Sequence, residues 1–253
     1  MSHKFHSSDA HTLSVVIPVY NEESAIEKIL LDWHRELTST GLSFLLVLVN
    51  DGSTDGSLAN INRWIEQNKA QDSTKVISQH NQGHGASILN GYRIALDSGS
   101  PLIFQCDSDD QIEAKDFSKL WRETPKADFI LGKRLERHDP IIRLFMSRIM
   151  RLWVFLLFGL RILDPNCPFR LFKREFLQEA LTKTKIPSNS FAPNIHLSIE
   201  AFKKARRGTL KCKTVPIIHQ LRQSGVPSLR GIFKLFTISL RVIRELIAHR
   251  CSR

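Results

Sequence analysis

Short apolar runs alternate with segments of helical periodicity in the first half of the chain. The run 13–19 is continuous and rich in β-branched residues, which is typical of a strand buried on both faces. The predicted strands are 13–19, 44–49, 75–78, 102–106 and 129–131, and the predicted helices are 25–37, 58–65 and 85–96. This order predicts an α/β fold with a mostly parallel sheet flanked by helices on both faces.

The second half of the chain contains longer helical patterns and fewer strands. We expect helices over 140–163, 174–183 and 229–250, and strands over 169–173 and 210–215. The last helix is amphipathic, with cations along one stripe and an apolar face formed by Ile232, Phe233, Phe236, Leu240, Ile243 and Ile247. Two interpretations of this helix stay open: it lies in a membrane surface, or it packs on the core or on a second subunit.

The pattern divides the chain into three parts. Residues 1–12 are polar and are expected to be flexible, 13–228 form one α/β domain, and 229–253 form a basic amphipathic C-terminal helix suited to a membrane interface. The longest uncharged apolar run of the second half, 152–160, is about half of the ~20 residues that span a bilayer. We therefore expect peripheral membrane attachment. Four cysteines without a CxxC pair suit a reducing, cytoplasmic compartment.

Charge separates the two halves of the chain. Residues 1–130 hold 11 Lys and Arg against 18 Asp and Glu, whereas residues 131–253 hold 25 against 7. The overall net charge of +11 therefore comes from the second half alone. Such a basic half indicates anionic partners: phosphate groups, an anionic membrane surface or nucleic acid.

An acidic motif follows the predicted strand 102–106. Ligands of parallel sheets bind beyond the carboxyl ends of the strands, which is where Asp107 and Asp109 fall. Two carboxylates two residues apart at a strand end can turn toward one hard cation, Mg²⁺ or Mn²⁺, that keeps positions open for substrate phosphates. Solvated acidic turns have the same pattern, so the surrounding motifs decide between the two interpretations.

Four motifs in order together resemble glycosyltransferase family 2 over residues 13–133. They are VIPVYNE at 16–22, VNDGSTD at 49–55, NQGHG at 81–85 followed by Gly91, and DSD at 107–109. The resemblance implies the Rossmann-like GT-A fold and a metal-dependent transferase that uses a nucleotide-sugar donor. It also implies a nucleotide site of Pro18, Tyr20, Glu22, Asp51, Gly52 and Asp107, a metal site of Asp107, Asp109 and Gln111, and catalytic roles for Asp109 and Arg134.

These roles are chemically reasonable. Tyr20 offers an aromatic face for the base, Glu22 an acceptor for ribose hydroxyls, and Asp51 an acceptor for a ring N–H. Gly52 lets the backbone pass close to the ligand. The family often has two acids before this glycine, but the first is Asn50 here, so Asp51 carries the acceptor role alone.

The second half resembles the polyprenyl-phosphate branch of the same family. The matching segments are DSDDQ at 107–111, GKR at 132–134, SR at 147–148, NCPFRLF at 166–172 and VPIIHQLR at 215–222, with Gly225 and Ser228 beyond them. This branch moves one sugar, with inversion, onto a lipid phosphate at the cytoplasmic face of a membrane. The resemblance implies Arg134, Arg148 and Arg222 as ligands of the acceptor phosphate. The residues after Ser228 depart from the branch pattern.

Acceptor chemistry favours a lipid phosphate independently. A hydroxyl acceptor needs a general base, and no adjacent acidic pair occurs after Gly132 to supply one. A phosphate monoester is already an oxyanion near neutral pH and needs cationic orientation, which guanidinium groups provide. Two alternatives stay open: a family 2 transferase that acts on a hydroxyl of a glycan or protein, and a basic protein that binds nucleic acid, which lacks a recognised binding motif. The sequence assigns no sugar, base, metal preference or oligomeric state.

Overall fold

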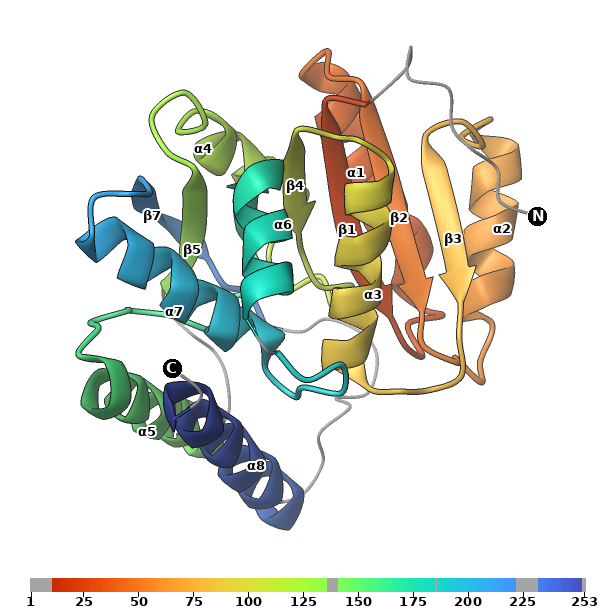
Figure 1. Cartoon of the computed structure of the whole chain (residues 1–253). Coiled ribbons are helices and arrows are strands. Elements are labelled where there is room, and N and C mark those ends of the chain that lie inside the picture. Colours follow the sequence, from red (N-terminus) through yellow and green to blue (C-terminus); the bar gives the residue numbers. More distant parts are fainter. Residues whose placement is uncertain (1–10, 136–140, 185, 222–231, 252–253) are drawn as a thin grey trace.

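The computed structural model describes residues 11–135, 141–184, 186–221 and 232–251 (Figure 1). Seven strands form one sheet in the order β3-β2-β1-β4-β6-β5-β7. Strand β6 runs antiparallel to both of its neighbours, and the other pairs are parallel. The predicted α/β fold is thus confirmed. The strands are β1 Leu13–Val19, β2 Phe44–Asn50, β3 Thr74–Ser78, β4 Leu102–Gln105, β5 Phe129–Leu135, β6 Arg170–Lys173 and β7 Cys212–Ile218.

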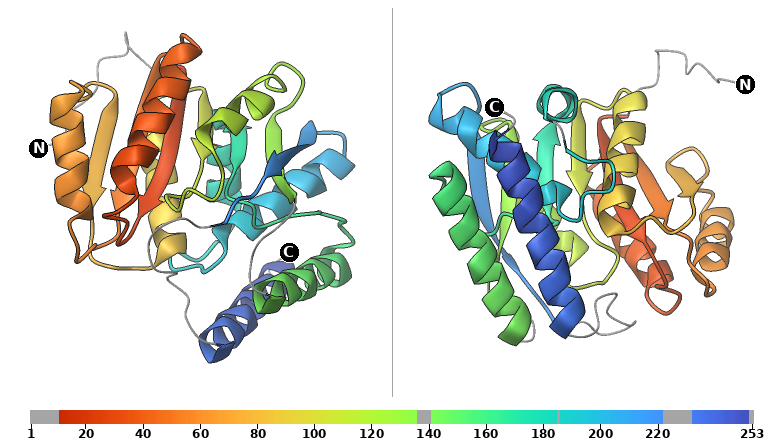
Figure 2. Two further views of the ribbon diagram at one scale, coloured as in Figure 1. Left: turned by 180° about the vertical axis from the view of Figure 1, so that it is seen from behind. Right: turned by 60° about the horizontal axis from the view of Figure 1, so that its bottom comes forward.

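Helices cover both faces of the sheet (Figures 1 and 2). Helices α1, α2 and α4 lie on one face, and α3, α6 and α7 lie on the other. Their bounds are α1 Ile26–Ser39, α2 Ser57–Gln67, α3 His84–Asp97, α4 Phe117–Trp121 after the 3₁₀ turn η1 Ala114–Asp116, α5 Ile141–Phe158, α6 Arg174–Lys183, α7 Pro193–Arg206 and α8 Ile232–Cys251.

The core lies between the sheet and these two layers. Every residue of β1 and of β2 is buried, as their uninterrupted apolar runs predict. An aromatic cluster fills the layer behind β4: the ring of Phe104 lies 5.2 Å from Trp33, 5.2 Å from Phe117 and 4.7 Å from Phe169. This cluster fixes β4, and with it the acidic motif that follows the strand.

The short helix α4 was not predicted from the sequence, and two longer helices also differ from the prediction. Helix α7 was not predicted, because its buried residues include Asn194, His196, Ser198 and Glu200, which erase the apolar periodicity that marks a helix. Helix α5 ends at Phe158 rather than at residue 163, since Gly159 adopts a left-handed conformation with φ of 65° and stops it there.

Helices α5 and α8 pack beside each other at the lower edge of the molecule in Figure 1, the edge toward which the arrowheads of β2 and β3 point. On α5, Met150, Val154 and Phe158 are buried, whereas an exposed stripe runs along another side of the helix. We call it the α5 stripe; it consists of Ile141, Phe145, Arg148, Leu152 and Leu156.

Helix α8 uses one side for the core and leaves another exposed. Val242, Leu246 and His249 are buried, whereas Phe236, Leu240 and Ile247, part of the apolar face predicted from the sequence, are exposed. The side of α8 formed by Val242 and Leu246 therefore packs on the core, and Ile243 of the predicted apolar face is half-buried against the same core. Within the described residues, none of the helices combines the length and apolar character needed to cross a membrane.

A buried polar network ties α8 to α7. The Glu245 carboxylate accepts a hydrogen bond from the Ser190 hydroxyl at 2.6 Å and lies 3.4 Å from His196 Nε2. His249 Nε2 lies 2.9 Å from Glu200 Oε1, and the rings of His249 and His196 are 5.1 Å apart. Because these groups are ionisable, we expect the docking of α8 to be sensitive to pH.

The first prediction concerns this sensitivity. Burial lowers the pKa of His249, assisted by the charges of His196 and Lys203 and opposed by Glu200. A depressed histidine pKa favours the neutral form in the folded state. Its contribution to stability is therefore present above the unfolded pKa and lost as pH falls below it. We expect the free energy of unfolding by urea to fall between about pH 7.5 and about pH 5.5.

The variant His249→Gln is the matched comparison, because glutamine can still donate to Glu200 but does not titrate. Its unfolding free energy is expected to fall less over the same interval. Burial would raise the pKa of Glu245, but the hydrogen bonds from His196 and Ser190 outweigh it and lower this pKa, so Glu245 acts only at more acidic pH. An equal fall in the wild type and the variant would contradict the assignment to His249.

Candidate active site

Three loops meet at the carboxyl ends of β1, β2 and β4. The Asp51 amide donates to the Val19 carbonyl at 2.9 Å, and the Ser108 hydroxyl donates to the Pro18 carbonyl at 2.8 Å. These bonds place the loop after β2 and the loop after β4 on either side of the end of β1. The parallel register of the strands therefore brings the predicted nucleotide and metal motifs to one edge of the sheet.

The loop after β1 is tied to the loop after β2. Asn21 has a left-handed backbone, with φ of 54°; its amide donates to Ser53 Oγ at 3.1 Å, and its side-chain oxygen accepts from the Thr54 amide at 2.8 Å. The Glu22 amide donates to a buried hydroxyl, Ser57 Oγ, at 2.8 Å. As a result Tyr20 is 37% exposed at the rim, whereas Glu22 is buried.

Asp51 anchors the loop that follows β3 to the loop that follows β2. Its buried carboxylate accepts hydrogen bonds of 2.8 Å from the Gln79 side chain and from the amides of Gln82 and Gly83. A carboxylate accepts about four hydrogen bonds, so one further position suits the predicted base N–H. Gly52, with φ of 68°, lies so close to the same loop that an added Cβ would meet the Asn81 amide nitrogen at 2.8 Å. The loop that precedes α3 is thus fixed by the motif after β2.

The acidic motif after β4 is held in a defined conformation. Asp107 is a quarter exposed, and its Oδ1 lies 3.4 Å from His84 Nε2 at the start of α3. Asp109 accepts a hydrogen bond from the Gln111 amide at 3.2 Å. Asp110 adopts a left-handed conformation with φ of 54° and pairs with Lys28 of α1 at 2.7 Å, so its carboxylate is directed toward α1.

The donor atoms of this motif suit a divalent cation of the Mg²⁺ or Mn²⁺ type. Asp107 and Asp109 flank a serine whose hydroxyl is fixed, and both carboxylates are partly exposed. Gln111 directs its amide nitrogen to the Gln220 carbonyl at 3.4 Å, which leaves its amide oxygen as a hard ligand. In the described part of the chain, no group of three or more His, Cys, Asp or Glu side chains is placed to hold a metal ion. A cation held by Asp107, Asp109 and Gln111 would take its remaining oxygen ligands from water or phosphate groups.

The predicted phosphate-binding arginines have different surroundings. Arg134, near the end of β5, pairs with Asp164 through Nε and Nη2 at 2.8 and 2.9 Å. Arg148 is exposed within the α5 stripe. Arg222 and Ser228 lie outside the described residues. No sequence pattern singles out Asp164 as the partner of Arg134, since thirty residues separate the two along the chain. His84 belongs to the NQGHG motif, and the fold places it beside Asp107.

An open hollow of about 610 Å³ lies beside the acidic motif, next to Asp110. It is lined by charged residues that already pair with one another: Lys28 with Asp32 and Asp110, and Lys115 with Glu113. The hollow lies on the α1 side of Asp110, away from the loop that contains Asp51. Its lining contains four acids and three cations, so its net charge is close to zero and slightly negative.

Comparison with known proteins identifies the family. The profile of glycosyl transferase family 2 matches residues 14–192, which is most of the chain. The chain belongs to glycosyl transferase family 2. The family resemblance predicted from the four motifs is thus confirmed.

Relatives within the family include undecaprenyl-phosphate 4-deoxy-4-formamido-L-arabinose transferases. The protein from Pseudomonas aeruginosa (strain LESB58) is 31% identical over 187 residues, covering 71% of this chain and 54% of that protein. The protein from Shewanella sediminis (strain HAW-EB3) is 27% identical over 265 residues, covering 94% of this chain and 78% of that protein. The chain spans about half the length of the Pseudomonas relatives that it matches.

The fold is shared with glucosyl-3-phosphoglycerate synthase from Mycobacterium tuberculosis. The structure of that enzyme with Mn²⁺, UDP-glucose and phosphoglyceric acid superimposes with a TM-score of 0.69 and 20% identity, covering 96% of this chain and 80% of that chain. Another structure of the synthase contains Mg²⁺ and UDP. The likeness establishes the GT-A fold for this member of the family.

The second prediction tests Asp51 as the anchor of the nucleotide loops. Asp51→Ala leaves three N–H donors without their acceptor, and we expect a loss of about 2 kcal/mol in the free energy of unfolding. We also expect weaker binding of a nucleoside diphosphate, measured by isothermal titration calorimetry. Asp72→Ala removes an exposed acid and serves as the control. Equal stability of the two variants would contradict the anchor role.

Proposed function

We propose that this chain transfers a sugar, with inversion at the anomeric carbon, from a nucleotide diphosphate-sugar to a polyprenyl phosphate at the cytoplasmic face of a membrane. The observation that carries the proposal is the placement of Asp107 and Asp109 beside the loops that contain Tyr20 and Asp51. One edge of the sheet thereby combines a hard-cation site with a candidate nucleotide pocket. The names of the undecaprenyl-phosphate relatives support the acceptor.

The donor half of the reaction uses residues that the fold has already fixed. Tyr20 at the rim offers a face to the base, and Asp51 holds the wall of the pocket. Asp107, Asp109 and Gln111 would hold Mg²⁺ or Mn²⁺, which neutralises charge on the departing nucleoside diphosphate. Structures of glucosyl-3-phosphoglycerate synthase, which has the same fold, contain Mn²⁺ or Mg²⁺ and support this choice of metal.

The acceptor half needs orientation more than proton removal. A phosphate monoester carries its nucleophilic oxygen as an anion near neutral pH, so a general base is unnecessary. Arg134 is held at the carboxyl end of β5, and Arg148 is exposed on α5. Guanidinium groups at these positions suit a phosphate delivered from a membrane surface. Arg222 is proposed as a third ligand from its motif.

The membrane surface is assigned to α5 and α8. The α5 stripe and the outward face of α8 together expose Phe145, Leu152, Leu156, Phe236 and Leu240, each at least 42% accessible. Arg241 and Arg244 also lie on α8, and the chain carries most of its positive charge in this half. Apolar side chains among cations are typical of helices that lie in the plane of an anionic bilayer.

The third prediction concerns the carboxylate pair. Asp107→Ala and Asp109→Ala are each expected to lower sugar transfer by at least about 10³-fold, because the diphosphate loses its charge compensation. The fold is expected to persist, since both side chains are partly exposed. Thermal shift with Mn²⁺ and UDP should vanish in both variants and persist in Asp97→Ala, which removes an exposed acid at the end of α3. Substantial activity in either variant would refute the metal role.

The acceptor class is decided by partition of the product. The protein is incubated with labelled nucleotide sugar, Mn²⁺ and polyprenyl phosphate, and label is counted in the organic phase. Metal-dependent appearance of label there supports the proposal. Label that stays in the aqueous phase on a glycan or protein would instead assign a hydroxyl acceptor.

The fourth prediction tests the membrane surface. The double variant Leu152→Glu with Leu156→Glu places two charges on the α5 stripe. We expect its binding to vesicles that contain anionic lipid to weaken by at least about tenfold, because two leucine side chains lose their burial. The control, Ala59→Glu with Asn62→Glu, adds the same charge to exposed positions of α2. Equal weakening in both variants would attribute the effect to net charge and overturn the assignment of the α5 stripe.

A further inference from the structure

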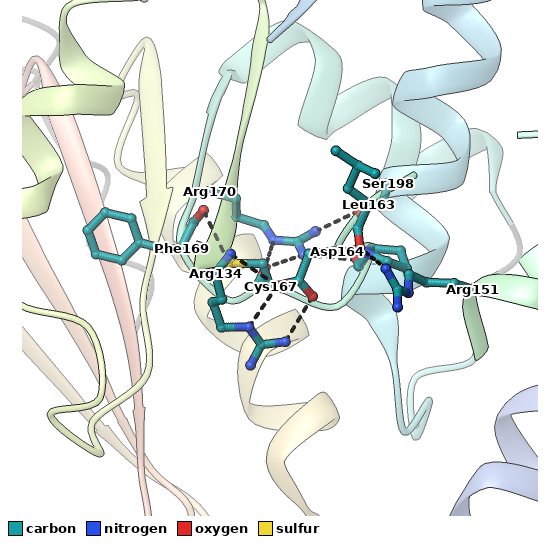
Figure 3. Close-up of polar contacts among 9 residues, drawn as sticks. Arg134, Arg151, Leu163, Asp164, Cys167, Phe169, Arg170 and Ser198 are labelled. Atoms are coloured by element: carbon teal, nitrogen blue, oxygen red, sulfur yellow. Dashed lines mark hydrogen bonds and ion pairs between the residues drawn. The ribbon is translucent and has the colours of Figure 1, made fainter. Parts of the chain in front are cut away.

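Arg134 forms a two-point ion pair with Asp164 that orients its guanidinium. Its Nε and Nη2 donate in parallel to the two oxygens of Asp164, and its backbone amide lies 3.4 Å from Asp164 Oδ2 (Figure 3). The side chains of Arg134 and Asp164 are only 13% and 6% exposed. The pair occupies one edge of the guanidinium, whereas the opposite edge carries the remaining N–H groups. Asp164 thus determines the direction in which that opposite edge points.

The backbone on either side of Asp164 is also fixed. Arg151 of α5 donates to the Leu163 carbonyl at 3.3 Å. The Pro165 carbonyl accepts from the Ser198 hydroxyl at 2.8 Å and from Arg170 Nη2 at 3.2 Å. Asp164 is therefore held in place from both neighbours, although it lies in a segment without regular secondary structure.

Arg170 is the centre of this support. Its guanidinium is fully buried and donates to the carbonyls of Pro165, Cys167 and Asn194, with Ser198 Oγ at 3.4 Å. Within the described residues, these hydrogen bonds go to three backbone carbonyls and one hydroxyl, so the side chain binds backbone across the loop rather than one acid. A buried cation of this kind is costly unless its hydrogen bonds fix a particular backbone conformation.

The supported loop lies directly against β5. The Gly132 amide donates to the Phe169 carbonyl at 2.8 Å, and a Cβ added at Gly132 would meet that same oxygen at 2.8 Å. Gly132 precedes Arg134 by two residues on the strand. The close approach brings the carboxylate of Asp164 within reach of the guanidinium.

We propose that Asp164 is a positioning residue that orients Arg134 toward the acceptor phosphate, and that Arg170 fixes the loop that carries it. The inference rests on the proposed role of Arg134 in binding that phosphate. Because Asp164 balances the charge of Arg134, the arginine contributes directed hydrogen bonds more than net charge. Orientation before the ligand arrives lowers the entropic cost of binding.

The test is a double-mutant cycle on acceptor kinetics at saturating donor. Asp164→Asn keeps the shape of the side chain and removes its charge. We expect this variant to raise the KM for polyprenyl phosphate about tenfold, or ~1.4 kcal/mol, while the Kd for UDP with Mn²⁺ stays unchanged. In an Arg134→Lys background, where the parallel pair cannot form, the same substitution is expected to change KM by less than about twofold.

Asp128→Asn is the matched control. Asp128 precedes β5, at the opposite end of the strand from Arg134, and pairs with Lys173 at 2.8 Å. This variant removes a more exposed ion pair at the other end of the same strand, so it reports loss of an ion pair of β5 without loss of the orientation of Arg134. Its acceptor KM is expected to equal that of the wild type. Asp164→Glu, which keeps the charge but moves the carboxylate, provides a second probe if Asp164→Asn does not fold, and we expect it to raise the acceptor KM as well.

The outcomes separate the inference from the proposed function. The positioning role is wrong, and the phosphate role stands, in either of two cases. In the first, Arg134→Lys raises the acceptor KM but Asp164→Asn and Asp164→Glu do not. In the second, the increases in KM caused by the two single substitutions multiply in the double variant. If Arg134→Lys leaves the acceptor KM unchanged, the proposed role of Arg134 in binding the phosphate is wrong. If the wild type makes no lipid product, the proposed function as a whole is wrong.

Discussion

The antiparallel insertion of β6 between β4 and β5 is the constraint on which the two halves of the site depend. Arg170 at the start of β6 is paired with Gln105, the last residue of β4, and with Leu131 of β5. Arg170, which supports the Asp164 loop, therefore also fixes the position of the acidic motif relative to Arg134. A register shift of one residue in β6 would turn its guanidinium to the other face of the sheet and separate the two halves.

The loops on the donor side of the site are held together by contacts within the protein. The loops after β1, β2 and β3 are joined by side-chain-to-backbone hydrogen bonds, and most of these come from short polar residues that also favour turns. Most of the hydrogen bonds that the Asp51 carboxylate can accept come from other residues of the protein. Selection of a base therefore depends on how these loops are held as much as on the single contact predicted from the motif.

The fold was predictable wherever apolar periodicity is strong. The continuous runs of β1 and β2 and the motif after β4 predicted the sheet, its parallel character and the edge that holds the site. Helix α7 was not predicted because its buried side includes polar residues. The pairing of Arg134 with Asp164 was not predicted because it joins a strand to an irregular loop. On α8 the sequence identified an apolar face but not that Val242 and Leu246 form the side that packs on the core.

The location of Arg148 within the α5 stripe bears on which lipids such an enzyme accepts. On the proposed membrane surface, a guanidinium among exposed leucines lies at the depth of the lipid head groups. An acceptor then presents its phosphate to the protein while its hydrocarbon tail stays among the acyl chains. On this proposal, the number of isoprene units would have little influence on recognition, and short and long carriers would be used alike.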